Sequence, residues 1–337
     1  MPPLTPYQRA TREGIRAAQH EHQRLGTDLH RRVEIFDVIE DERIWLLFTR
    51  LQNLFGAYKR YDDAAGIVIN SQHPPTLQRF TAAHEYGHHV LGHTASADDE
   101  GRIMRRPQDL QEVAAQAFAG EFLMPLQLVN YTFRTMGFSG KPLSLTPRQV
   151  YEFALELGVS YGAAVTQLVG QHIIGVSTGQ RLRKQSPLAL KTAISGAKPS
   201  NSWADVWILD ESQEGRALTP RLRDEIHVSL EENPTTGYVW TLADDASAAL
   251  SLVMDEYEEQ SSDDVIGGGG RRHLHFRVTH PGNARIRLEK RRPWQQAATA
   301  VSTFEAIVNA LPAVTGESED GLAEDQKRAI LAAGQAA

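Results

Sequence analysis

The sequence contains no cysteine among its 337 residues. This absence excludes a disulfide framework, thiolate metal ligands and a cysteine nucleophile. A basic excess is lacking too, because 35 Lys and Arg stand against 42 Asp and Glu, which gives a formal net charge of −7. Surfaces that bind DNA or RNA usually carry the opposite balance, so we expect no direct nucleic-acid binding.

Long hydrophobic runs are also missing. No stretch approaches the roughly 18 consecutive apolar residues of a membrane span. The first residues, "MPPLTPYQRATREGIRAAQHEHQRLG", are polar and not of the signal-peptide type. We therefore expect a cytoplasmic protein with no membrane association. The length allows two or three domains.

The N-terminal part has mainly helical spacing of its apolar residues. We predict helices over most of residues 7–60, interrupted by an extended stretch near Val33 to Val38. The apolar positions that support them are Ile15, Ile44, Leu46, Leu47, Leu51, Leu54 and Phe55. "GIVIN", residues 66–70, reads as a strand and precedes a helix rich in histidine. A second helix, "DLQEVAAQAFAGEFLM", stops at Pro125, and further helices follow over residues 146–194.

From about Trp203 the apolar period changes from helical to alternating. Three stretches alternate with polar residues, and turn signals separate them: Ile226, Val228 and Leu230; Leu274, Phe276 and Val278; Ile286 and Leu288. Short alternating strands of this kind are typical of a β-sandwich. The end of the chain reads as an acidic tail. We therefore predict an α+β protein with a domain over 1–142, a helical extension or linker over 143–200, a β-sandwich over 201–313 and a tail over 314–337.

"TAAHEYGHHVLGHT", residues 81–94, carries four histidines. In a helix His84 and His88 lie about 40° apart around the axis, so both rings can reach one metal ion. Glu85 shares their sector, which gives the H-E-x-x-H arrangement with a glutamate beside the metal. His89 points about 140° away from His84, and Gly92 is expected to end the helix and leave His93 in the loop as a hydrogen-bonding residue.

A catalytic zinc ion takes three protein ligands and one water, so another donor is needed. We considered Asp98, Asp99, Glu100, Asp109, Glu112 and Glu121. Glu112 is favoured, because it shares a helix face with the small residues Ala115 and Ala119, which permit close approach to the histidine helix. Glu121 points about 180° away from Glu112. Manganese or iron would also suit two histidines and a carboxylate.

Two features of this expected site stay open in the sequence. If a metal-bound water attacked a peptide carbonyl at this site, a further group should stabilise the oxyanion that forms. Tyr86, Tyr131, His89 and His93 are the candidates. The "GIVIN" strand is either an edge that pairs with an extended substrate or an ordinary core strand.

"RFTAAHEYGHHVLGH", followed by "EVAAQAFAGEFLMP", resembles the ImmA/IrrE family of metallopeptidases over roughly residues 10–142. The resemblance implies a zincin-like fold, with His84, His88 and Glu112 as zinc ligands and Glu85 as the catalytic base. It also implies a protein substrate of the helix-turn-helix repressor type.

The C-terminal part resembles the chagasin-type inhibitors of papain-like cysteine peptidases, which are immunoglobulin-like sandwiches with three binding loops. The resemblance rests on "NPTTGYVW" at 233–240, "GGGG" at 267–270 and "RRPW" at 291–294. It implies partner-binding loops formed by Asn233, Pro234, Thr235, Thr236, Gly237, Arg292, Pro293 and Trp294. Trp294 could instead plug the core of the sandwich.

Three hypotheses of function follow. The leading one is a regulatory zinc endopeptidase that cleaves a repressor or antitoxin-like protein, with the C-terminal sandwich in docking or regulation. The second is a binding module that captures or inhibits a papain-like peptidase, with the metal domain as scaffold. The third, a metal-binding transcription factor with a helix-turn-helix in residues 146–194, lacks a clear basic recognition face.

Overall fold

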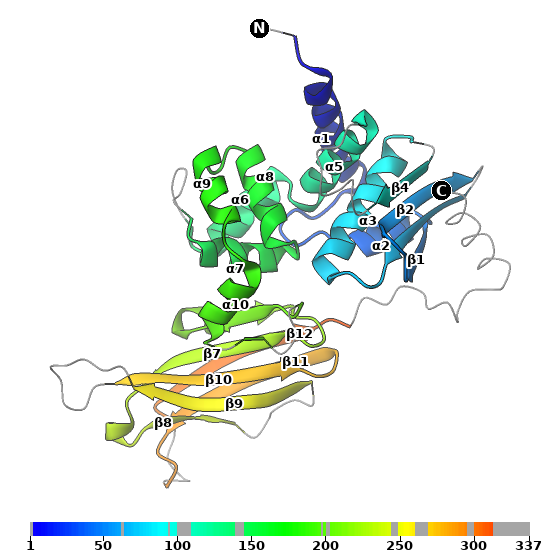
Figure 1. Cartoon of the computed structure of the whole chain (residues 1–337). Helices are drawn as coiled ribbons and strands as arrows, with labels where there is room; N and C mark the ends of the chain where they lie inside the picture. The colour runs from blue at the N-terminus through cyan, green and yellow to red at the C-terminus, as the bar shows by residue number, and fades with distance from the viewer. Residues whose placement is uncertain are drawn as a thin grey trace, which may run out of the picture. The chain divides into compact units, whose positions relative to one another are not determined.

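The computed structural model describes residues 3–61, 64–93, 95–99, 109–138, 145–196, 198–199, 203–243, 249–259, 269–294 and 300–312. The chain divides into two compact units, Met1–Gln185 and Ser186–Ala313. Helices dominate unit 1 and strands dominate unit 2, which makes the protein α+β as predicted (Figure 1). Among the described residues no helix is long and apolar enough to cross a membrane.

Unit 1 combines a small mixed sheet with helices. The sheet has the strand order β1-β3-β2-β4, with β1 parallel to β3 and the other pairs antiparallel. Its strands are β1 (Trp45–Thr49), β2 (Leu54–Tyr61), β3 (Ala64–Asn70) and β4 (Ala95–Asp99). The helices are α1 (Pro6–Leu25), α2 (Ile35–Asp41), α3 (Pro75–Val90), α5 (Leu110–Leu123), α6 (Leu126–Thr135), α7 (Pro147–Leu157), α8 (Tyr161–Gly170) and α9 (Val176–Arg183).

The first 60 residues differ from the prediction. Residues 35–41 form a helix where we expected an extended stretch, and the apolar residues between Ile44 and Phe55 lie mainly in β1 and β2. A short apolar run fits either a buried strand or a buried helix, so its spacing alone misassigned it. The aromatic and β-branched side chains of β1, "WLLFT", favour the strand.

The strand predicted at 66–70 is confirmed as part of β3, but it is not an edge. It pairs with β1 on one side and β2 on the other, so the edge-strand alternative for "GIVIN" is wrong. The described edge next to β2 is β4, which carries Asp98 and Asp99. Figure 1 shows α3 beside this sheet, and α3 packs on β2 and β3.

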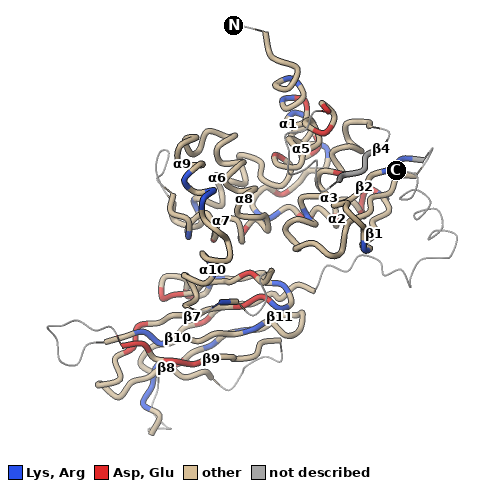
Figure 2. The backbone as a smooth tube through the Cα atoms, in the orientation of Figure 1, with Lys and Arg blue, Asp and Glu red and all other residues tan. Residues whose placement is uncertain are grey.

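Helices α7 and α8 are joined by a three-residue turn. Thr146 caps the start of α7 with a capping box, Gly158 ends it in a left-handed conformation with φ 62°, and Ser160 caps α8. Such a short turn with a glycine is typical of helix-turn-helix motifs. Yet α8 carries no Lys, Arg, Asp or Glu, so it is drawn in tan in Figure 2, where charged residues are blue or red.

Unit 2 contains two four-stranded sheets, with orders β5-β7-β10-β9 and β6-β12-β11-β8. The three predicted alternating stretches lie in β7, β10 and β11, and their apolar residues are buried. The elements are α10 (Pro187–Ser195), β5 (Val206–Leu209), η1 (Glu211–Gln213), β6 (Ala217–Leu218), β7 (Glu225–Glu232), η2 (Pro234–Thr236), β8 (Val239–Leu242), β9 (Leu250–Glu259), β10 (Gly270–Val278), β11 (Gly282–Arg291) and β12 (Ser302–Ala310).

The helical segment predicted as a linker is divided between the units. Helices α7 to α9 belong to unit 1, whereas α10 belongs to unit 2, where Lys191 donates to the carbonyl of Ala204 at 2.6 Å. The predicted boundaries 1–142, 143–200 and 201–313 stay a prediction. The predicted tail, 314–337, and residues 267–268 of the glycine run lie outside the described residues.

Candidate metal centre

Helix α3 carries the histidine motif and is almost entirely buried around it. Pro75 stands at its first position, where a missing N–H costs nothing. The helix ends at Val90, and Gly92 follows with φ 73°. His93 therefore lies just beyond the helix, as its spacing predicted. Buried imidazoles need polar partners, and His84 and His88 are only 2% and 1% exposed.

Three donor side chains meet at one point. His84 Nε2 lies 3.1 Å from His88 Nε2 and 3.3 Å from Glu112 Oε2, while His88 Nε2 lies 3.6 Å from Glu112 Oε1. The histidines come from α3 and Glu112 from the first turn of α5, which packs beside it. Among the described residues this is the one cluster of His, Asp and Glu whose ligand atoms all lie within 4.8 Å of one another.

These distances suit a divalent metal ion. Donor atoms about 2.0–2.1 Å from a tetrahedral ion stand about 3.3–3.4 Å from each other, and the three separations bracket that value. Two imidazoles and one carboxylate form a ligand set that leaves a further coordination position. Burial alone would raise the pKa of Glu112, but the His84 and His88 rings beside its carboxylate hold that pKa well below its ordinary value. The carboxylate is therefore ionised, as a ligand must be.

Glu85 lies beside this cluster and is fully buried. Its side chain faces β2: a Cβ added to Gly56 would lie 3.3 Å from Glu85 Oε1 and only 2.5 Å from Thr81 Cγ2. The absence of a side chain at residue 56 thus makes room for the carboxylate. Sequence reasoning missed Gly56, although a glycine inside a strand is a known signal of close approach.

His93 contacts a member of the cluster directly. Its Nδ1 lies 2.7 Å from His88 Nδ1, and its backbone N–H donates to the carbonyl of His88 at 3.0 Å. Burial lowers the pKa of His93, and the neighbouring His88 lowers it further, which favours a neutral ring. A neutral His93 can accept the Nδ1–H of His88 and leave His88 Nε2 as the free lone pair.

Two of the other acidic residues considered as the third ligand, Asp109 and Glu121, are engaged elsewhere in the described structure. Asp109 caps α5 and accepts the N–H of Gln111. Glu121 lies at the far end of α5, where Gln19 donates to it at 3.0 Å and Gln167 at 3.1 Å. Asp98 and Asp99 belong to β4, and Glu100 lies outside the described residues.

Three of the four oxyanion candidates are engaged elsewhere. The Tyr86 hydroxyl donates to Glu21 at 2.5 Å, toward α1. Tyr131 packs edge-on against His30, and His89 Nδ1 lies 3.1 Å from the hydroxyl of Tyr58 on β2. Only His93, of these four, touches the donor cluster.

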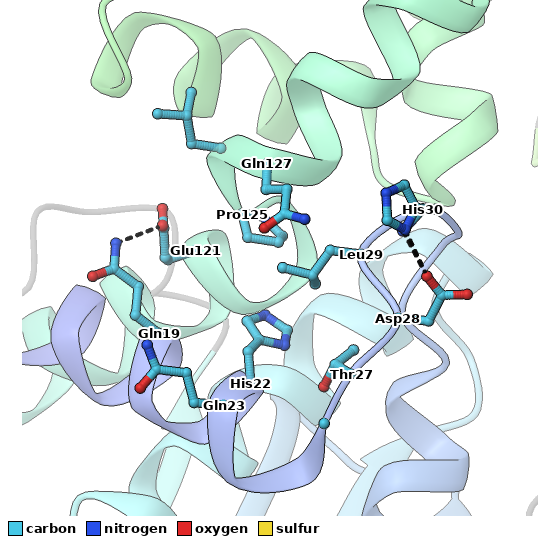
Figure 3. A pocket seen from close by; sticks show the side chains of 12 residues that line it. Gln19, His22, Gln23, Thr27, Asp28, Leu29, His30, Glu121, Pro125 and Gln127 are labelled. Atoms are coloured by element: carbon cyan, nitrogen blue, oxygen red, sulfur yellow. Dashed lines mark hydrogen bonds and ion pairs between the residues drawn. The ribbon is translucent and has the colours of Figure 1, made fainter.

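A cavity of about 610 Å³ lies near the end of α1 and the start of α6, away from the donors. Figure 3 shows its lining, in which Gln19 is paired with Glu121 and His30 with Asp28. None of His84, His88 and Glu112 lines it. The cavity is therefore separate from the candidate metal centre.

The first and third predicted loops of the C-terminal unit lie next to each other. Asn233 Oδ1 accepts the N–H of Thr235, and Arg292 donates to the carbonyl of Thr236 at 3.3 Å. The Arg292 guanidinium also lies 4.6 Å from the centre of the Tyr238 ring. Gly237, with φ 79°, has a left-handed conformation that favours glycine, and Trp294 lies against it, because a Cβ there would lie 2.7 Å from Trp294 Cη2.

The other loop residues complete this surface. Thr235 donates from its hydroxyl to Asn233 at 2.6 Å, and Pro234 begins η2. Pro293 directly precedes Trp294, which is 68% exposed. That exposure rules out the alternative in which Trp294 plugs the core, a place that Trp240 occupies at 5% exposure.

Two family models match separate parts of the chain. Residues 39–168 match the IrrE N-terminal-like domain of the M78 peptidases, a range that includes α3 and α5 with all three donors. Residues 219–308 match the chagasin family of peptidase inhibitors, I42. A comparison with curated proteins finds no match.

Solved structures with similarity to the chain include a cysteine protease inhibitor and two further proteins. The inhibitor EhICP2 of Entamoeba histolytica is 23% identical, with 32% of this chain and 97% of that chain covered and a TM-score of 0.29. Amebosin is 32% identical, with 32% and 98% covered and a TM-score of 0.27. PbICP-C, solved in complex with falcipain-2, is 14% identical, with 32% and 90% covered and a TM-score of 0.20.

The two family matches agree with the two resemblances found in the sequence. The first supports a metallopeptidase and the second supports a cysteine peptidase inhibitor-like module. The chain joins an M78 peptidase domain of the IrrE type to a chagasin-family domain.

Proposed function

We propose that unit 1 is a zinc-dependent endopeptidase of zincin-like fold, in which His84, His88 and Glu112 hold the metal and Glu85 is the catalytic base. The observation that carries this proposal is the convergence of the three donor atoms within 4.8 Å, with Glu85 on the same helix. A purely structural metal site would have no use for a buried carboxylate at residue 85.

A bound divalent ion would lower the pKa of a coordinated water toward 7 and polarise the substrate carbonyl. The residues do the rest. Glu85 takes the proton of the attacking water and passes it to the leaving amine. His93 fixes the ring of His88 through the Nδ1 contact of 2.7 Å. Gly56 leaves the space in which the Glu85 carboxylate is held.

The edge of the sheet supports a route for an extended substrate. Among the described strands β4 pairs only with β2, so it is the terminal strand of the described sheet. An extended peptide can add to such an edge through main-chain hydrogen bonds. We place this role on β4, because β3 is an interior strand.

The substrate is proposed to be a regulatory protein, of the DNA-binding repressor or antitoxin-like class. The ImmA/IrrE resemblance and the M78 match support this choice. The cytoplasmic location stays a prediction, and the ImmA/IrrE resemblance also implies a role in stress response. Direct DNA binding by α8 is not favoured, since this helix has no basic side chain.

The experiment compares wild-type protein with Glu85→Gln. Each is co-expressed with candidate repressors, and the cellular proteome is measured by mass spectrometry after each is induced. Elemental analysis of both proteins should find one equivalent of zinc. Proteins that disappear only with the wild type are the expected substrates. Equal loss with both variants, or zinc in neither, would eliminate the endopeptidase.

We further propose that the loop surface of unit 2 docks a protein partner or regulates the peptidase. The exposed Trp294 beside Arg292 and Tyr238 supports this role, since large aromatic and arginine side chains dominate binding hot spots. The alternative is inhibition of a papain-like peptidase. Titrating papain with the full chain carrying Glu85→Gln separates the two: inhibition at micromolar concentration that Trp294→Ala removes would support the inhibitor.

A further inference from the structure

A groove of about 480 Å³ runs through unit 1, bounded by α1, α3, α5 and α8. Its volume lies in the range of ligand-binding clefts. Half-buried apolar side chains such as Leu77 and Phe80 line it, together with amides such as Gln116. No Lys or Arg lines it, and its one acid, Glu121, is held by Gln19 and Gln167. The groove therefore suits an uncharged ligand.

The groove continues the faces that carry the metal donors. Leu77 and Phe80 precede His84 by seven and four residues, so they share its side of α3 within about 40°. Gln116 and Gly120 follow Glu112 by one and two turns along α5. None of the three donors lines the groove itself, but Phe80 and Gln116 lie about one helical turn, roughly 5 Å, from His84 and Glu112 along their helices.

Helix α8 forms the fourth wall of the groove, and this position accounts for its exposed surface of small, uncharged residues. Its groove-lining positions include Gly162, Thr166 and Gly170, which are all exposed. This is the second helix of the helix-turn-helix arrangement, yet it is small and uncharged where a DNA-reading helix would carry basic side chains. Its exposed side forms one wall of this groove.

We propose that this groove binds an uncharged, mainly apolar segment of the protein substrate on one side of the cleaved peptide bond. The inference rests on the proposed peptidase function and names the substrate chemistry of the same site. Along α5 the lining residues run from Gln116 to Met124, which is eight rises of about 1.5 Å, or about 12 Å of helix. An extended peptide rises about 3.3 Å per residue, so the groove holds three to four substrate residues.

Glycine 162 offers a clean way to block the groove. A Cβ at Gly162 would meet no heavy atom within 4 Å, and the same is true of Gly175, which lies outside the groove. Neither glycine has a positive φ. A side chain at residue 162 therefore has space at its Cβ, so Gly162→Trp is chosen to obstruct the groove and Gly175→Trp is the matched control. Circular dichroism and the unfolding midpoint of both variants verify that they fold.

The first measurement is binding, made without catalysis. In the Glu85→Gln background with a chelator present, a fluorescein-labelled dodecapeptide of Leu, Ala, Ser and Gln is titrated by anisotropy. A counterpart with Lys at every third position is the charge control. We expect the neutral peptide to bind at least tenfold more tightly than the Lys peptide, Gly162→Trp to raise its Kd at least tenfold and Gly175→Trp to change it less than twofold. An unchanged Kd in Gly162→Trp, or no preference for the neutral peptide, overturns the proposal.

The second measurement is the cleavage pattern of the zinc-loaded chain on a proteome-derived peptide library. Apolar, uncharged residues should be enriched at three to four consecutive positions on one side of the cleaved bond. Gly162→Trp should lose the enrichment and Gly175→Trp should keep it; the same pattern in all three proteins overturns the groove. If wild type and Glu85→Gln both cleave nothing, the proposed function fails, while the binding measurement still decides on the groove.

Discussion

The Nδ1 atoms of His88 and His93 lie 2.7 Å apart. One ring must donate and the other accept, so each histidine selects the tautomer of the other. With His88 as donor, its Nε2 is unprotonated and turned toward His84 and Glu112. His93, which lies beyond the end of α3, thereby sets the tautomer in which His88 can bind a metal ion through Nε2.

Replacing His93 with alanine is expected to weaken zinc binding by about 10–100-fold, because His88 loses the partner that fixes its ring. Competition against a chromophoric chelator measures the affinity. His20→Ala on the exposed side of α1 is the control and should change nothing. An unchanged zinc affinity in His93→Ala would show that the contact does not orient His88.

Gly56→Ala should lower both stability and activity. The new methyl group would overlap Thr81 Cγ2 and the carbonyl of Val68, at 2.5 and 2.9 Å, and would press on Glu85. We expect a loss of about 1–3 kcal/mol in the free energy of unfolding and at least a tenfold drop in cleavage rate. Gly66→Ala on β3 is the control, since its nearest contact would be 3.8 Å away. Full activity of Gly56→Ala would contradict the role of this space.

Acid should destabilise unit 1 partly through Glu34. Burial alone would raise the pKa of Glu34, but the charges of Arg79 and Arg32 outweigh it and keep the pKa below its ordinary value of 4.5. A lowered pKa in the folded protein means that Glu34 stabilises above pH 4.5 and that this contribution disappears as the pH falls further. The Glu34 Oε2 to Arg79 Nη1 distance is 2.8 Å.

The test is calorimetry of the full chain between pH 3 and 7, fitted with one transition for each unit. Glu34→Gln should lower the free energy of unfolding by about 1–3 kcal/mol at pH 7 and flatten its decline below pH 4.5. Glu40→Gln, at an exposed position of α2, should behave as wild type. A Glu34→Gln profile parallel to wild type would refute the assignment.

The two tryptophans of the loop region should differ sharply. Trp294→Ala is expected to change the free energy of unfolding by less than about 0.5 kcal/mol, because its side chain is 68% exposed. Trp240→Ala should cost about 3–5 kcal/mol, since it empties a core position and removes the bond from Nε1 to the carbonyl of Glu231. Denaturant unfolding of both variants measures the difference, and equal losses would contradict it.

The histidine helix, its end near Gly92 and the following glutamate helix follow from local signals that need no tertiary information. The 3.6-residue period places His84, Glu85 and His88 in one sector wherever the helix lies. Glu112 could be ranked first because small residues on its face permit close approach. That ranking concerned the packing of two helices, and the structure brings Glu112 within 3.3 Å of His84.

The remaining features depend on contacts between distant segments. The run from Ile44 to Phe55 becomes strands because β3 lies between β1 and β2, and spacing carries no information about such pairing. β4, "ASADD", has no hydrophobic signal at all. Gly56 and the groove wall formed by α8 become meaningful only once α3 is placed against them.

A hydrogen bond from Arg79 links the histidine helix α3 to the helical segment that follows residue 142. From the second turn of α3, five and six residues before His84 and Glu85, its side chain reaches the carbonyl of Gly158 at 3.1 Å and is 1% exposed. A fragment that ends at residue 142 would lack Gly158, so the buried Arg79 guanidinium would lose this hydrogen-bond acceptor. The fragment would also lack α8, which forms one wall of the groove. The smallest working peptidase to express is therefore a fragment that runs through α9, and its shorter form should be recovered mainly as insoluble protein.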